Sequence, residues 1–109
     1  MDMPEKWVSA LRAWAMANNS VRELWLFGLR ATGPSRYDSD IDLAIALMAT
    51  KGVDNWALGK YMAFGDDWQR ELCALVGRHV SLEVILPGSK EDRHVRTTGK
   101  RLMVRPTNE

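Results

Sequence analysis

Residues 24–47 read LWLFGLRATGPSRYDSDIDLAIAL, and this segment indicates two strands joined by a polar connection. The apolar run from Leu24 to Phe27 is short and ends at Gly28, which is typical of a buried strand. From Asp40 to Leu47, apolar residues alternate with aspartate and alanine, which is the period of a strand with two different faces. The connection, residues 29–39, is polar and is compatible with a short helix at its start.

Helical and strand patterns alternate outward from this segment. Trp7 to Ala17 carries apolar residues at helical spacing, and the pattern from Asp54 to Val76 is helical again. Gly59 and Gly65 favour two helical pieces over one long helix in the second region. The remaining expected elements are a strand from Val80 to Leu86, a short helix over residues 90–98 and a last strand from Arg101 to Arg105. We therefore expect an α/β (α+β) fold of one domain over residues 1–109, with a small mixed β-sheet and helices packed on one face.

The composition is that of a globular protein. Of the 109 residues, 46% are hydrophobic and 27% are charged, and the formal net charge is +1, which argues against disorder. This length holds one core, so we expect any further binding surface to come from a partner or a second copy. One cysteine excludes an internal disulfide. The chain also offers few zinc ligands, namely Cys73, His79 and His94. No uniform apolar run indicates a signal peptide or membrane span, and we expect a cytoplasmic protein.

Basic residues gather near the C-terminal end of the sequence. Between residues 89 and 109 they are Lys90, Arg93, Arg96, Lys100, Arg101 and Arg105. We interpret them as a solvated basic face, with a nucleic-acid patch as the less favoured alternative. Five tryptophans are many for this length, and we interpret them as core residues more readily than as a stacking platform.

Asp40 and Asp42 form the first candidate site. On a strand they would leave the same face with α-carbons roughly 6.6 Å apart, close enough for both carboxylates to reach one cation or a bridged pair. A divalent cation would also neutralise their mutual repulsion. The alternative places Ser39 and Asp40 in a turn and leaves Asp42 as a lone solvated residue. The spacing alone does not decide between the two.

Gly28 marks the second candidate site. A glycine at the end of a strand lets a ligand approach the backbone, and the amides that follow can hold phosphate oxygens. Arg30 would add a charge-assisted contact to a triphosphate, as would Arg36. The alternative is an ordinary turn followed by a solvated loop.

Together the two segments resemble the minimal nucleotidyltransferases (MNT) of the DNA polymerase β superfamily. The family signature is Gly-Ser, ten residues and Asp-x-Asp; here Gly28-Leu29 is followed by residues 30–39 and then by Asp40-Ile41-Asp42. The resemblance extends to the Gly77-Arg78 approach to a third strand and to the Gly99 turn, so it covers nearly the whole chain.

The resemblance implies a nucleotidyltransferase fold and a two-metal transfer reaction. Asp40 and Asp42 would hold two Mg²⁺ ions about 3.5–4 Å apart, one activating an acceptor hydroxyl and the other stabilising the leaving pyrophosphate. The substrate would be a nucleoside triphosphate, ATP by preference. Residues at the matching positions that would contact it are Gly28, Leu29, Arg30 and Ser39.

The sequence departs from the family at two positions. The serine after the glycine is Leu29, which removes a hydroxyl group but leaves the backbone amide. The third carboxylate of the family falls on Ser81 in an ungapped alignment, and Glu83 lies two residues further on the same face of the strand. We hypothesise that Glu83 is the third catalytic and metal-binding acid; the alternative is a surface charge.

Two functions follow as expectations. The first is transfer of a nucleotidyl group, AMP by preference, to a hydroxyl group of a partner protein, because related minimal nucleotidyltransferases are antitoxins that adenylylate a small helical HEPN toxin. The second is a catalytically degenerate fold that binds a nucleotide or a partner, for which Leu29 and Ser81 are the motivation. A HEPN-like partner or a homo-oligomer is expected, no membrane is expected, and nucleic-acid binding ranks well below both functions.

Overall fold

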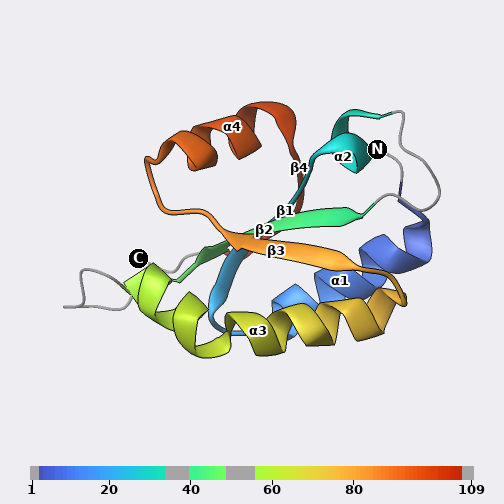
Figure 1. Cartoon of the computed structure of the whole chain (residues 1–109), viewed down its shortest axis with the longest axis horizontal. Coiled ribbons are helices and arrows are strands. Elements are labelled where there is room, and N and C mark those ends of the chain that lie inside the picture. Colours follow the sequence, from blue (N-terminus) through green and yellow to red (C-terminus); the bar gives the residue numbers. More distant parts are fainter. Residues whose placement is uncertain (1–2, 34–39, 49–55, 107–109) are drawn as a thin grey trace.

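The computed structural model describes residues 3–33, 40–48 and 56–106 of the chain. Its elements follow in the order α1 (Glu5–Ala17), β1 (Val21–Phe27), α2 (Leu29–Thr32), β2 (Ile41–Leu47), α3 (Trp56–Val76), β3 (Val80–Val84), α4 (Lys90–Thr98) and β4 (Lys100–Val104) (Figure 1). The α/β class expected from the sequence is confirmed, including a short helix directly after Gly28. Ser39 and Arg36 lie outside the described residues, as does the expected start of the second helical region at Asp54.

Within the described residues, the strands form one four-stranded mixed sheet in the order β3-β2-β1-β4. Strand β1 runs antiparallel to both β2 and β4, whereas β2 and β3 are parallel. The end of β1 therefore lies beside the start of β2, where Phe27 pairs with Asp42. Asp42 in turn pairs with Ser81 near the start of β3. This edge of the sheet brings together the segments that the sequence singled out.

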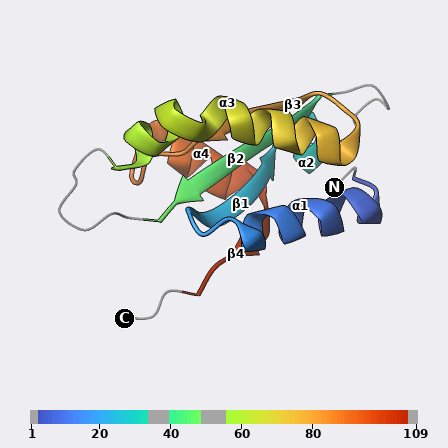
Figure 2. The same ribbon diagram turned by 90° about the horizontal axis from the view of Figure 1, so that it is seen from below.

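Helices α1 and α3 lie side by side on one face of the sheet (Figure 2). Leu11 of α1 and Leu72 of α3 are fully buried against the apolar side of β2, which Ile41, Leu43 and Ile45 provide. The alternation in β2 thus turns these three residues to the helices and the aspartate and alanines to the other side. The four tryptophans whose side chains are described belong to the core or its border, as predicted: Trp25 and Trp68 are buried, and Trp7 and Trp14 are partly buried against the core.

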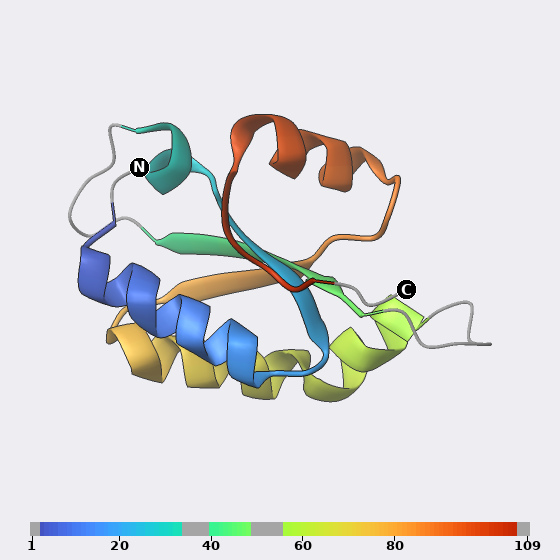
Figure 3. The same ribbon diagram turned by 180° about the vertical axis from the view of Figure 1, so that it is seen from behind.

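Helix α4 lies on the opposite face of the sheet, so the expectation that the helices pack on one face is wrong for this element (Figures 1 and 3). Val95 of α4 is buried in a second apolar cluster with Trp25, Ala44 and Ile85. Ala44 pairs with Trp25 across β1 and β2. The alanines of β2 leave a flat floor here, and burying the large Trp25 ring beneath a helix removes apolar surface from water.

Helix α3 is one unbroken helix of 21 residues, and the expected break at its glycines is absent. Gly65 is buried, and a Cβ at this position would lie 3.0 Å from the Tyr61 ring. The Tyr61 hydroxyl donates a hydrogen bond of 3.0 Å to the Leu82 carbonyl of β3, so Gly65 makes room for a ring that ties the helix to the sheet. Among the described helices, none is both long enough and apolar enough to pass through a membrane.

Candidate metal and phosphate site

Gly28 lies against the Asp42 carboxylate at the shared edge of β1 and β2. A Cβ at Gly28 would collide with Asp42 Oδ2, and φ is +73°, a conformation that side chains rarely tolerate. Directly after it the chain enters α2, where the Gly28 carbonyl accepts hydrogen bonds from the amides of Ala31 (3.1 Å) and Thr32 (3.2 Å). Only glycine combines this turn with such close approach to the acid.

Asp42 and Asp40 form a coupled pair of carboxylates. Asp42 is half-buried and is the second residue of β2, whereas Asp40 is exposed and lies directly before this strand. Burial raises the pKa of Asp42, the negative charge of Asp40 raises it further, and the nearby His79 acts in the opposite direction. The charged form of Asp42 is therefore disfavoured in the free protein, and a cation at this position would relieve both causes.

Glu83 does not lie directly beside the pair. The parallel register of β2 and β3 pairs Asp42 with Ser81 and Ala44 with Glu83, so Glu83 is one step further along the same face. Among the described residues, no group of three or more His, Cys, Asp or Glu side chains lies close enough to hold a metal ion. Glu83 is exposed and lines a cavity of about 300 Å³ beside α4.

The two residues after Gly28 have opposite environments. Leu29 is 61% exposed, so the side chain that replaces the family serine faces solvent. Arg30 is only 4% exposed, and its guanidinium lies 5.5 Å from the centroid of the Trp7 ring. The phosphate contact of Arg30 stays a prediction, whereas its cation–π contact with α1 was not indicated by the sequence. The prediction missed this because the partner, Trp7, is distant in sequence.

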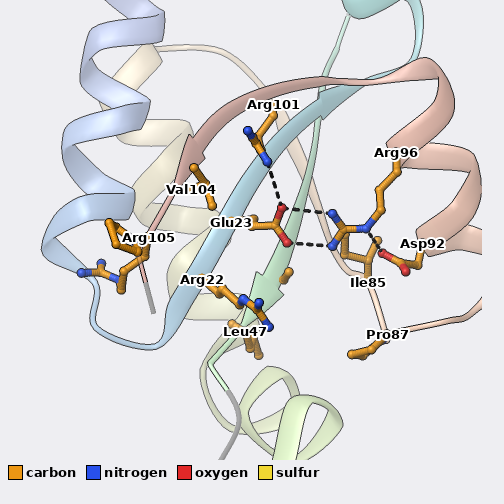
Figure 4. Close-up of a pocket in the computed structure, with 12 residues that line it drawn as sticks. Arg22, Glu23, Leu47, Ile85, Pro87, Asp92, Arg96, Arg101, Val104 and Arg105 are labelled. Carbon is orange, nitrogen blue, oxygen red and sulfur yellow. Dashed lines mark hydrogen bonds and ion pairs between the residues drawn. The ribbon is translucent and has the colours of Figure 1, made fainter. Parts of the chain in front are cut away.

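A cavity of about 520 Å³ lies elsewhere on the α4 face and holds a charge network (Figure 4). Glu23 of β1 is only 6% exposed and receives two hydrogen bonds from Arg96 of α4, at 2.7 and 3.1 Å. Arg96 also donates to Asp92 at 2.7 Å. The hydrogen bond from Arg96 lowers the pKa of Glu23, although burial acts against it. The sequence did not single out Glu23, and the available signal was an acid directly before the apolar run from Leu24 to Phe27.

Arg105 caps the C-terminal end of α1. Its Nη2 donates to the carbonyls of Ala15 (3.0 Å), Met16 (2.9 Å) and Asn18 (3.1 Å), and its Nε donates to the Val21 carbonyl at 3.0 Å. A cation here also complements the negative end of the helix dipole. Arg96 and Arg105 thus have structural contacts within the protein. The predicted solvated basic face is therefore wrong for these two residues, and the alternative of a nucleic-acid patch is weakened as well.

Comparison with solved structures finds toxin–antitoxin complexes. One is a toxin–antitoxin with AMP-PNP, with a TM-score of 0.61 and 22% identity over 90% of this chain and 73% of the other. A second is a tri-AMPylated Shewanella oneidensis HEPN toxin in complex with an MNT antitoxin, with a TM-score of 0.61 and 20% identity over 94% and 74%. A third is a mutant of the toxin–antitoxin MntA-HpeT, with a TM-score of 0.60 and 19% identity over 94% and 75%.

No protein-family model matches the sequence, and no curated relative matches it either. At these identities the structural likeness is evidence about the fold. The mixed sheet, the glycine turn and the acid pair occur together in a chain that superposes along nine tenths of its length. The chain therefore shares its fold with these toxin–antitoxin structures, which confirms at the level of fold the resemblance found in the sequence.

Proposed function

We propose that this chain, as one minimal domain, is a metal-dependent nucleotidyltransferase that moves a nucleotidyl group from a nucleoside triphosphate to a hydroxyl group of a partner protein. The observation that carries the proposal is the contact between Gly28 and the Asp42 carboxylate. It joins a turn suited to phosphates with a carboxylate whose pKa is raised by burial and by Asp40. Neither ordinary turn chemistry nor core packing requires that combination.

The residues fit a bound Mg²⁺. Mg²⁺ prefers carboxylate oxygens and commonly shares its coordination with substrate phosphates. Asp40 and Asp42 would supply the carboxylates, and Glu83, one step further along the neighbouring strand, would have to move toward them to serve as a third oxygen donor. Two such ions, when bound, would activate an acceptor hydroxyl and neutralise charge on the leaving pyrophosphate.

The backbone at the start of α2 would hold the phosphates. The first amides of a helix lack acceptors within that helix, and the Gly28 and Leu29 amides would serve the β- and γ-phosphates. Leu29 in place of serine removes one hydrogen bond to a charged group, worth about 1.5–3 kcal/mol, which weakens binding without abolishing it. Two further candidate contacts are Ser39, from the segment before Asp40, and Arg30, which is buried beside the glycine turn.

The transferred group in our proposal is AMP from ATP, and the acceptor is a small helical HEPN-like protein. The α-phosphorus gains a bond to the acceptor oxygen and loses its bond to the β-phosphate oxygen, and the hydroxyl proton leaves to water. Support comes from the fold match to a complex with AMP-PNP and to a complex of an AMPylated HEPN toxin with an MNT antitoxin. The proposed role is that of an antitoxin in the cytoplasm, where ATP is available.

The test is transfer of label from α-labelled ATP. The purified chain is incubated with Mg²⁺ and the helical protein encoded by a neighbouring reading frame. We expect label on the partner, no label from γ-labelled ATP, and no transfer by Asp42→Asn. Asp66→Asn, an exposed acid of α3, is the matched control and should transfer normally.

A second function is favoured by one observation. The acid pair has no third ligand beside it among the described residues, and Leu29 stands at the phosphate position. A degenerate transferase fold that binds a nucleotide or neutralises its partner without catalysis would have these features. Binding of ATP and partner with no transfer in the labelling experiment would establish this second function against the first.

A further inference from the structure

Helix α4 divides the open face of the sheet into two cavities. Asp92 and Arg96, four residues apart, face the larger cavity that contains Glu23. Glu91 and His94, three residues apart, face the smaller cavity of about 300 Å³. Val95, between these two sides, is buried on the sheet. The two cavities therefore belong to opposite sides of one short helix.

The smaller cavity is the one next to the acid pair. Its lining includes Phe27, which pairs directly with Asp42, and Glu83, which pairs with Ala44 two residues further along β2. Two residues of a strand correspond to roughly 6.6 Å. The larger cavity is reached at Ala46, four residues and roughly 13 Å along the strand from Asp42. The smaller cavity is therefore the one near enough to the acid pair to hold another part of a nucleotide whose phosphates lie there.

The lining of the smaller cavity suits an uncharged group with hydroxyl or amino substituents. Phe27 and His94 offer rings, and Val95 offers an apolar floor. Among the described residues of the lining, Glu83 and Glu91 outnumber the one cation, Lys90, so the lining has a net negative charge that disfavours phosphates. Both carboxylates can accept hydrogen bonds from ribose hydroxyls or an exocyclic amine. About 300 Å³ is at the lower end of small-molecule sites, which suits part of a nucleotide.

We propose that this cavity binds the nucleoside part of the triphosphate, with the base against the rings of Phe27 and His94 and the sugar toward Glu83 and Glu91. This inference rests on the proposed function, because it assumes that the phosphates lie at Gly28 and Asp42. It assigns His94 a binding role that neither the sequence pattern nor the family resemblance indicated. It also gives Glu83 a contact beyond the metal.

The test compares ATP with inorganic tripolyphosphate, which has the phosphates but no nucleoside. Affinities are measured calorimetrically with Mn²⁺ for the wild type, His94→Ala and the control Thr97→Ala. Both side chains are exposed on α4, and Thr97 does not line the cavity. Loss of base stacking should weaken ATP about tenfold in His94→Ala and leave tripolyphosphate unchanged. Thr97→Ala should bind both as the wild type does.

A second measurement does not depend on substitution. The sequence has two histidines, His79 and His94, so their ring proton resonances can be assigned with a His79→Asn variant. We expect ATP with Mg²⁺ to shift the His94 resonances, while tripolyphosphate with Mg²⁺ leaves them in place.

The outcomes separate this inference from the proposed function. If ATP affinity and the His94 resonances are unaffected while transfer proceeds normally, the nucleoside assignment is overturned and the proposed function stands. If His94→Ala loses transfer at unchanged ATP affinity, the cavity takes the acceptor and the assignment is again overturned. If the wild type binds neither ATP nor tripolyphosphate in an Asp42-dependent way, both proposals fall.

Discussion

Gly28 is the residue on which the candidate site depends, because it meets two demands at once. Its φ of +73° and its contact with Asp42 both exclude a side chain. Gly77 meets only the first demand, since its φ is +67° and nothing lies within 4 Å of an added Cβ. Substitutions at Gly28 and Gly77 can therefore separate the effect of backbone strain from the effect of losing the close contact with Asp42.

Gly77→Ala should reduce the free energy of unfolding by about 1–3 kcal/mol through strain alone and leave Mn²⁺–ATP affinity unchanged. Gly28→Ala should carry a similar strain and in addition displace the Asp42 carboxylate. We expect its Mn²⁺–ATP affinity to fall on the order of tenfold, equivalent to about 1.4 kcal/mol. Urea unfolding and titration calorimetry measure the two effects. Equal affinities in the two variants would show that the contact with Asp42 has no part in binding.

Asp42 should make the free protein less stable at neutral pH. Its pKa is raised above its ordinary value of 3.8, so the folded state binds the proton more tightly than the unfolded state. Its contribution to stability is therefore favourable below about pH 3.8 and is lost as the pH rises through the folded pKa. Asp42→Asn should raise the free energy of unfolding at pH 7 and have little effect near pH 3, as urea unfolding at the two pH values would show. A loss of stability at pH 7 would contradict this.

Helix α4 is held on the sheet by an ion pair as well as by Val95. Glu23 is nearly buried, so removing Arg96 leaves a charge without its main partner, which in buried pairs costs about 3–5 kcal/mol. Because Arg96 is partly exposed, we expect Arg96→Met to cost less, about 2–3 kcal/mol. The second substitution Glu23→Gln should restore part of the loss. Denaturation of the four proteins of this cycle measures the coupling, and additive effects would exclude it.

Arg105 should stabilise α1 without affecting chemistry. Arg105→Ala leaves the carbonyls at the end of α1 without their charged donor and should cost about 2–3 kcal/mol. Arg105→Lys should recover only part of this, because an ammonium group lacks the planar arrangement of donors. Arg93→Ala is the control, since Arg93 is exposed and donates to a single carbonyl, that of Gly88. Thermal unfolding measures stability, and nucleotide affinity should be equal in all three variants.

At the scale of the whole molecule, ligand binding should be visible as stability. A ligand at one hundred times its Kd that binds only the folded state stabilises it by about 2.7 kcal/mol. Since 1 kcal/mol corresponds to roughly 4–8 °C for a domain of about this size, ATP with Mg²⁺ should raise the Tm of the wild type by roughly 10–20 °C. The increase should be absent in Asp42→Asn and present in Asp66→Asn. An equal increase in Asp42→Asn would place the nucleotide away from the acid pair.

Local patterns were sufficient for the order of helices and strands and for the two aspartates, although they predicted a break in α3 that the structure does not have. The apolar run before Gly28 and the alternation from Asp40 to Leu47 each report a backbone period over a few residues, and β1 and β2 follow them. Gly28 was predictable as a turn because it interrupts an apolar run. Its contact with Asp42 followed once the two strands paired antiparallel with Phe27 opposite Asp42.

Contacts between segments far apart in the sequence were decided only by the tertiary structure. The position of α4 over Ala44, the cap that Arg105 places on α1 and the burial of Arg30 against Trp7 each join such segments. The periodicity of a short segment does not indicate which of its polar side chains will contact a distant segment. The register of β2 and β3 is of the same kind, because it sets Ser81 beside Asp42 and moves Glu83 toward α4. The sequence by itself thus determined the strands, the glycine turn and the acids, since these depend on neighbours along the chain. The residues that surround the site come from segments distant in sequence, so only the tertiary structure shows which of them lie there.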